Sequence, residues 1–204
     1  MDKISPAHNN YSMPPGLFEY LLIVCPAMEV YKKIMEEKWK FYRNYRYAKA
    51  IKTRPQIVLA NFLAWENMED TIIRRLQSMT KEQRSFGVTL NNYSGFPSDT
   101  VYIRVQDTSS FKEINARLQA LSPYIKQANA ASAKMIQYPS INLAAQLPPE
   151  VYNEAIRDYS EKDFTASFSV TELVLLRRQH PYDKSKELGV FRLQPMKEQL
   201  NQVL

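Results

Sequence analysis

The chain has 204 residues, of which 45% are hydrophobic and 24% are charged. This length can form one domain or two closely associated lobes, and the composition excludes an intrinsically disordered protein. The net charge of +6 favours anionic partners without identifying one. No apolar run approaches the ~20 residues that span a bilayer, so we expect no membrane partner.

The single cysteine bears on location and on the limits of the folded part. Cys25 lies in an apolar run and is expected to be a packed thiol, which indicates a reducing, cytoplasmic compartment. Residues 1–16 are polar and proline-rich, so they are predicted to form a flexible arm without a signal-peptide core. The folded domain is expected over 17–195, followed by a tail over 196–204.

Hydrophobic periodicity divides the first half of the chain into alternating strands and helices. Tyr31, Ile34 and Met35 have helical spacing between two apolar strand-like runs. In chain order we predict a strand over 20–25, a helix over 27–43, a strand over 54–65, a helix opened by Asn67, and a strand over 86–93.

The second half restarts the same order. Its first helix should begin at a capping box formed by Ser110 and Glu113, with an apolar stripe that runs to Leu121 and Ile125. We predict a strand over 101–106, this helix, a strand over 138–147, a helix opened by Pro148 and Pro149, and closing strands over 164–176 and 188–193. The order is therefore β-α-β-α-β, repeated once with an added strand.

One strand segment occurs twice. Residues 54–63 read RPQIVLANFL, and 84 residues later residues 138–147 read YPSINLAAQL. A proline followed by alternating isoleucine and leucine predicts a strand with one face fixed by packing. The other face then carries Gln56 and Val58 in the first copy, and Ser140 and Asn142 in the second.

This doubled strand resembles the two-histidine phosphoesterase superfamily, which includes the bacterial RNA 2′-5′ ligase-like cyclic phosphodiesterases. Members carry two copies of a Pro-His-φ-Thr-φ strand, where φ is apolar, facing each other across a cleft. The resemblance implies an α+β fold, a bilobal pseudo-symmetric repeat with antiparallel-rich sheets, outer helices and a central cleft.

The resemblance also implies where catalysis would occur, and both histidine positions are replaced. Gln56 and Ser140 stand at the family's general acid and base, and Val58 and Asn142 stand at its phosphate-holding hydroxyls. Glutamine and serine do not titrate near neutral pH, so we expect no catalytic residues and no activity by the family mechanism. An active enzyme that uses non-standard residues stays an alternative, with His8 and His180 as the histidines available.

Strand alternation predicts which polar side chains accompany the motif positions. If their faces converge, the cleft floor holds Thr89 and seven candidate ligand-binding residues, namely Arg54, Gln56, Tyr102, Arg104, Tyr138, Ser140 and Asn142. Arginine offers a fork of donors to phosphate, which favours a nucleotide or an RNA end as partner. The alternative is an ordinary solvated sheet face.

Residues 38–54 combine basic and aromatic side chains and contain no acidic residue. Tyr45 or Tyr47 could stack on RNA bases while the cations contact phosphates. We favour the simpler alternative, in which the rings anchor in the core and the cations are solvated, leaving at most non-specific affinity for RNA.

Other chemistry is not indicated. The sequence has no metal-ligand spacing and no glycine-rich phosphate loop, so we expect no metal and no cofactor. Glu150, Glu154 and Asp158 share a helical face, which solvation explains most simply. Oligomeric state is left open.

Overall fold

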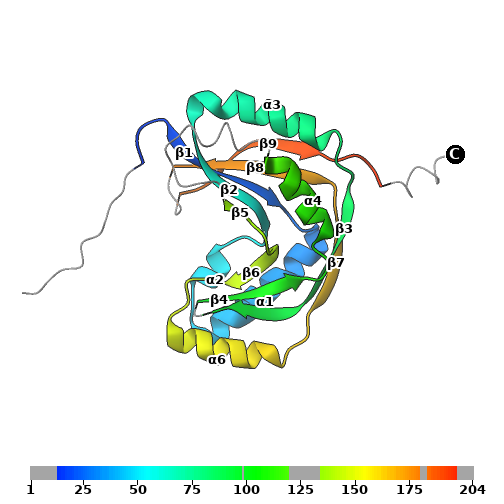
Figure 1. The fold of residues 1–204 in the computed structure, drawn as a ribbon. Coiled ribbons are helices and arrows are strands. Elements are labelled where there is room, and N and C mark those ends of the chain that lie inside the picture. Colours follow the sequence, from blue (N-terminus) through cyan, green and yellow to red (C-terminus); the bar gives the residue numbers. More distant parts are fainter. Residues whose placement is uncertain (1–12, 98, 120–133, 180–182, 197–204) are drawn as a thin grey trace, which may run out of the picture.

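The computed structural model describes residues 13–97, 99–119, 134–179 and 183–196. Two sheets lie one above the other, and every paired strand in them is antiparallel (Figure 1). Sheet 1 has the order β5-β2-β1-β8-β9, formed by Lys134–Met135, Ile57–Trp65, Leu17–Val24, Glu172–Arg178 and Lys186–Arg192. Sheet 2 has the order β6-β4-β3-β7, formed by Ser140–Ala144, Thr100–Val105, Phe86–Phe96 and Thr165–Val170. The predicted α+β fold with two antiparallel sheets is confirmed.

Helices cover one face of each sheet. On sheet 1, α3 (Glu69–Thr80) packs against β9 and α4 (Ser109–Leu118) packs against β2. On sheet 2, α1 (Met28–Tyr45) and α6 (Pro149–Ser160) lie side by side, with the rings of Phe41 and Tyr159 5.7 Å apart. The short α2 (Lys49–Lys52) packs against α1 and β6. Figure 1 shows α3 above the upper sheet and α6 below the lower one, so these helices lie outside the pair of sheets.

One large hydrophobic core runs beneath these helices. It includes Leu22 and Leu59 from sheet 1 together with Ile103 and Ile141 from sheet 2, all at most 1% exposed. Because the apolar faces of both sheets belong to one cluster, the two lobes share a core. The opposite faces of the sheets are left to face the space between them.

The strand predicted over 164–176 is two strands in different sheets. β7 ends at Val170 in sheet 2, and β8 begins at Glu172 in sheet 1. The backbone carbonyl of Thr171 accepts a hydrogen bond from the Leu193 amide at 2.8 Å, which fixes the crossing point. No glycine or proline marks this change, since the turn is set by pairing with two different sheets. The prediction of one strand was wrong for this reason.

Both polar helix starts were also predicted wrongly. A 3₁₀ turn over Glu66–Met68 precedes α3, whose N-cap is Met68 without a side-chain bond, so Asn67 does not open the helix. At α4 the cap is Thr108, and Asp107 instead accepts hydrogen bonds from the Ser109 amide at 2.9 Å and hydroxyl at 3.0 Å. The helix opened by Pro148 and Pro149 is confirmed.

Two further expectations meet different outcomes. Cys25 was predicted to be packed but is exposed, because β1 ends at Val24 and the chain turns away there. Leu121 and Ile125 of the predicted stripe lie outside the described residues, as do His8 and His180.

Gly95 on β3 lies directly against side chains of α6. A Cβ atom there would lie 2.6 Å from the Tyr152 hydroxyl oxygen and 2.8 Å from Ile156 Cδ1. We therefore predict that Gly95→Ala lowers the free energy of unfolding by about 1 kcal/mol, because the Tyr152 and Ile156 side chains must move from their packed positions to accommodate the methyl group. Urea unfolding followed by tryptophan fluorescence measures this change.

Gly87 on the same strand is the matched control. A Cβ atom there would meet nothing within 4 Å, so Gly87→Ala should leave stability unchanged or raise it by roughly 0.5 kcal/mol. Equal losses in the two variants would contradict close packing of α6 against Gly95.

Candidate functional site

Four of the predicted ligand residues lie together on the solvent-facing side of sheet 2. In the register of β4 and β6, Tyr102 pairs with Asn142 and Arg104 pairs with Ser140. The intervening residues point the other way and are buried, as expected for period-2 alternation. These four residues, the β4–β6 polar cluster, therefore form one continuous patch.

Neighbouring groups hold the two larger side chains of this cluster. Arg104 Nε donates to the backbone carbonyl of Asn91 at 3.2 Å, which leaves the terminal nitrogens of its guanidinium for another acceptor. The Tyr102 ring stacks on Phe96, with centroids 4.4 Å apart. Both side chains are thus oriented before any ligand binds, which lowers the entropic cost of binding.

Hydroxyl groups extend the patch across β3 and β7. Thr89 and Ser167 face each other in register, with their oxygens 3.2 Å apart. Thr89 was expected here, and Ser167 was missed because its strand was predicted as part of a longer one. The polar face of sheet 2 therefore offers donors and acceptors over all four of its strands.

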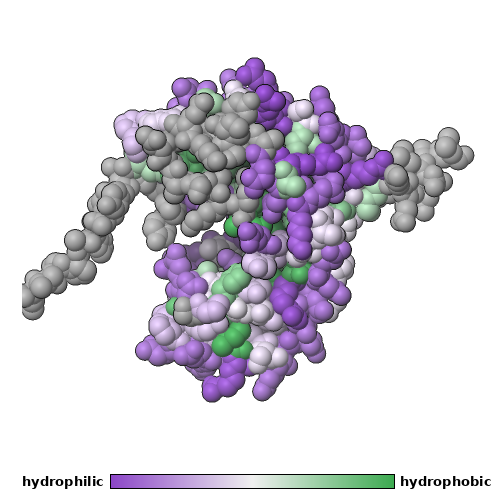
Figure 2. Space-filling view, viewed as in Figure 1, coloured by the Kyte–Doolittle hydropathy of each residue, from purple (hydrophilic) through white to green (hydrophobic). Residues whose placement is uncertain are grey.

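The first copy of the repeated strand contributes a different surface. Val58 packs against an apolar cluster of Leu21, Ile23, Val174 and Leu176, on the face of sheet 1 opposite α3 and α4. Gln56 is half-buried just before β2 begins. The molecular surface is hollowed between the two sheets (Figure 2). One wall of this hollow is thus largely apolar at the motif strand, and the other is polar.

Two of the predicted ligand residues, Tyr138 and Arg54, make no described contact with the β4–β6 polar cluster. Tyr138 is 70% exposed just before β6. Arg54 instead lies close to Cys25, just after the end of β1, because its charge acts on the Cys25 thiol. Burial and the carboxylates of Glu172 and Glu187 raise the pKa of that thiol, and the positive charge of Arg54 opposes the rise.

An ion pair on the same face of sheet 1 was missed by sequence reasoning. Glu19 accepts hydrogen bonds from Arg178 Nε at 2.6 Å and from Asn61 Nδ2 at 2.8 Å. Burial by itself would raise the pKa of the Glu19 carboxyl, but the hydrogen bonds and charge of Arg178 outweigh it and the pKa is lowered. Glu19 is therefore a charged, fully engaged group and a poor candidate for a general acid.

Lys38 was expected to be a solvated cation and is instead completely buried, at 0% exposure. Its ammonium donates to the Leu143 carbonyl on β6 at 2.9 Å, to the Ala50 carbonyl at 3.1 Å and to Thr53 Oγ1 at 3.0 Å. Burial lowers the pKa of this amine to about 7. The three bonds join α1 to β6 and to the segment that leads into β2, just behind both motif strands.

The tyrosines of the basic-aromatic segment are also engaged internally. Tyr45 donates to Asp158 Oδ2 at 2.7 Å, and Tyr47 donates to the carbonyls of Ala145 and Gln146 at 2.8 and 2.6 Å. Both rings pack against the core. They do not form a free platform for bases, and Asp158 is tied to Tyr45 rather than available to a ligand.

Two kinds of site are absent from the described part of the chain. No three acidic, histidine or cysteine side chains gather there in a way that could hold a metal ion. None of the described helices is long and apolar enough to cross a membrane.

Comparisons with known proteins agree with this architecture. A sequence profile of the 2′-5′ RNA ligase superfamily matches residues 32–181. Among solved structures, E. coli LigT complexed with 3′-AMP superposes with a TM-score of 0.62 at 13% identity, covering 87% of this chain and 98% of LigT. TT0787 of Thermus thermophilus gives 0.59 at 15% identity, covering 87% and 98%. LigT complexed with phosphate gives 0.56 at 14% identity, covering 88% and 99%. No curated protein sequence matches the chain.

Lys38 provides a test of how the region behind the motif strands is held together. Its pKa falls from 10.5 to about 7 on folding, so between these values the unfolded chain binds more protons than the folded one. Stability contributed by this residue must therefore rise as pH increases from 7 towards 10. We predict that the difference in unfolding free energy between the wild-type protein and Lys38→Met grows with pH across this window.

Urea unfolding at several pH values from neutral to mildly alkaline measures that difference. At neutral pH, Lys38→Met should be less stable by about 1–3 kcal/mol, because two buried carbonyls lose their donor. Lys40→Met is the control, since the Lys40 side chain is 55% exposed. A difference that does not change with pH would show that Lys38 titrates normally.

Proposed function

Because this chain belongs to the 2′-5′ RNA ligase superfamily, we propose that it is a catalytically degenerate member that binds a phosphate-bearing ligand. The ligand class is a nucleotide or an RNA end, bound in the cytoplasm between the two sheets. The observation that carries this proposal is the β4–β6 polar cluster, in which Arg104, Ser140, Asn142 and Tyr102 are adjacent on one exposed face.

The chemistry of the cluster suits phosphate recognition. The guanidinium of Arg104 can donate to two phosphate oxygens at once, and serine and asparagine side chains supply neutral donors beside it. The stacked rings of Tyr102 and Phe96 offer an aromatic surface next to these donors. E. coli LigT, which shares the fold, has been crystallised with 3′-AMP, with phosphate and with ATP, which supports the same ligand class here.

The replaced motif positions support the absence of two-histidine catalysis. Ser140 and Gln56 have no pKa near neutrality, so neither can exchange protons as imidazole does. Val58 belongs to an apolar cluster and has no hydroxyl to offer a phosphate. Hydrolysis or ligation by non-standard residues is the alternative, and the activity assay below separates the two.

Non-specific RNA binding through residues 38–54 is the second candidate. The engagement of Tyr45 and Tyr47 with the protein supports only a salt-dependent contribution from exposed cations in this segment.

Arg104 is the residue that tests the binding proposal. Arg104→Gln removes the charge while keeping a side chain of similar reach, so the affinity for 3′-AMP should fall about tenfold or more through loss of a charge-assisted contact. Isothermal titration calorimetry measures this. Arg74→Gln on the outer helix α3 is a matched control and should bind as the wild type does. Equal affinity in the two variants would place the ligand elsewhere.

An assay with 2′,3′-cyclic nucleotides and 2′-5′-linked oligonucleotides tests the proposed loss of activity. We predict no turnover by the wild-type protein, because the proton-transfer groups are missing. The variant Q56H/V58T/S140H/N142T restores the histidine and threonine side chains of the family motif at these four positions. It should gain turnover if the scaffold still positions these side chains for catalysis. Wild-type turnover that disappears in Gln56→Ala or Ser140→Ala would overturn the proposal.

A further inference from the structure

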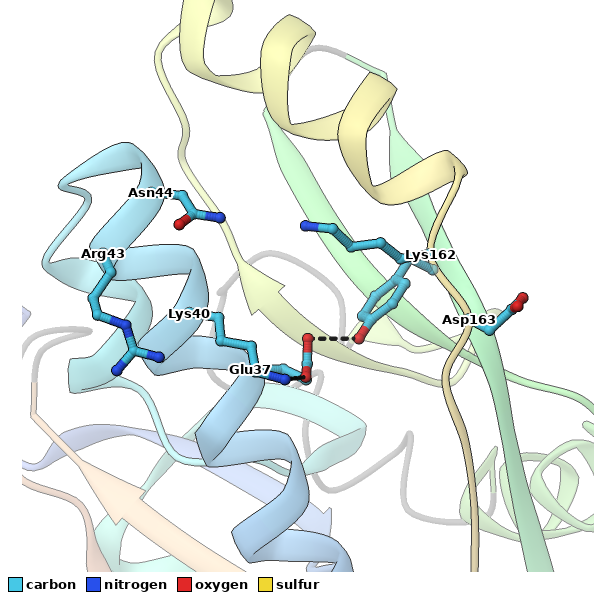
Figure 3. A pocket seen from close by; sticks show the side chains of 7 residues that line it. Glu37, Lys40, Arg43, Asn44, Lys162 and Asp163 are labelled. Carbon is cyan, nitrogen blue, oxygen red and sulfur yellow. Dashed lines mark hydrogen bonds and ion pairs between the residues drawn. The ribbon is translucent and has the colours of Figure 1, made fainter.

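A second polar hollow lies on the other face of sheet 2, away from the β4–β6 polar cluster. It has a volume of about 490 Å³, within the range of small-molecule sites and much larger than one phosphate ion needs. One wall is formed by Lys40, Arg43 and Asn44 from α1, and the other by Lys162 from the segment between α6 and β7. Figure 3 shows Asn44 and Lys162 extending towards each other across the space.

The floor of this hollow is built by an irregularity in β3. The pairing of β3 with β4 shifts between Leu90 and Tyr93, and Asn92 has a positive φ of 58°. This bulge reverses the alternation of the strand, so that Tyr93 points to the packed face and its hydroxyl donates to Glu37 Oε2 at 2.9 Å. The bulge is held in place by the backbone amide of Asn92, which donates a hydrogen bond to the backbone carbonyl of Phe164 at 2.7 Å.

The walls are fixed as well as the floor. Lys33 on α1 donates to the Thr165 carbonyl at 2.6 Å, and Tyr45 near the other end of α1 donates to Asp158 on α6. These contacts hold α1 against α6 and β7 on either side of the hollow. Its side chains are therefore presented from a preorganised frame.

The charges in the hollow are unbalanced towards the positive. Three cations line it against two carboxylates, Glu37 and Asp163. Both oxygens of Glu37 are occupied, by Tyr93 and by Lys40 at 2.7 Å, so this carboxylate holds the Lys40 ammonium at the rim. The Asp163 carboxylate points away from the other labelled side chains in Figure 3.

The remaining donors have no competing acceptor. Within the described residues, no hydrogen bond or ion pair engages the side chain of Arg43 or Asn44. Lys162 lies with Nζ 4.0 Å above the centre of the Tyr159 ring, which orients the ammonium without neutralising it. An amide and an ammonium that face each other across the space, with an arginine on the same wall as the amide, suit the oxygens of an extended anion.

From this arrangement we infer that the hollow, the α1–α6 anion pocket, binds a small ligand through a diphosphate or longer phosphate chain. The phosphates bridge Asn44 on one wall to Lys162 on the other, and Arg43, which lines the α1 wall with its guanidinium turned away from Lys162 in Figure 3, adds positive charge to that wall. Three of the seven lining residues are cations, so recognition depends on charge. The site is separate from the cleft, because it lies on the face of sheet 2 that packs α1 and α6.

Inorganic pyrophosphate is the probe for this pocket, titrated into the full chain by calorimetry. The double variant R43Q/K162Q should weaken pyrophosphate binding about tenfold or more, and Asn44→Asp should weaken it comparably by placing a carboxylate among the phosphates. All these side chains are at the surface, and thermal unfolding checks that the variants fold. In the wild type, the Asn44 side-chain amide should shift on titration in ¹H–¹⁵N spectra, and binding should weaken with added salt.

Two controls make the outcome decisive. R74Q/K112Q removes the same charge from α3 and α4, beside sheet 1, and should change the affinity less than twofold. The titrations of the wild-type pocket and of both double variants are repeated in an Arg104→Gln background, which removes the charged phosphate contact of the cleft, so that the remaining heat reports the pocket. The inference is overturned if the wild-type protein does not bind pyrophosphate, if R43Q/K162Q binds it normally, or if R74Q/K112Q weakens it equally.

Discussion

The buried ammonium of Lys38 is the contact on which the relation between the two motif strands depends. All three of its donors are used, on acceptors from β6 and from the segment just before β2. Burying a polar nitrogen costs several kcal/mol unless hydrogen bonds compensate, so these acceptors must stay in place around it. Because Leu143 lies in one copy of the repeat and Thr53 immediately precedes the other, one side chain ties the two halves of the molecule together.

The two copies of the repeat have diverged into walls of different character. In the second copy Ser140 and Asn142 join Arg104 and Tyr102 in a polar surface with oriented donors. In the first copy Val58 extends an apolar cluster on sheet 1, beside the Glu19–Arg178 ion pair. A hollow with one polar and one apolar wall suits binding of a ligand with a charged group.

Much of the fold could be predicted from periodicity, and the misses have identifiable causes. Strands such as Ile57–Trp65 and helices such as α6 follow directly from apolar spacing and from proline at a helix start. The break at Thr171 was missed because residues on both sides of it have strand-like sequences. β7 and β8 are separate strands only because each pairs with strands of a different sheet. The caps at α3 and α4 were misassigned because a 3₁₀ turn and Asp107 replace the expected side chains.

The sequence by itself determined the doubled strand and the outward positions of Ser140 and Asn142, because alternation and residue identity are local properties. The tertiary structure decided which of these positions meet. It joined Arg104 to Ser140 through strand register, buried Lys38 among three acceptors, and turned Tyr93 towards Glu37 through a bulge. These outcomes depend on contacts between residues 12 to 105 positions apart. A short-range pattern contains no information about such contacts, since the free energy that selects them comes from packing the whole chain.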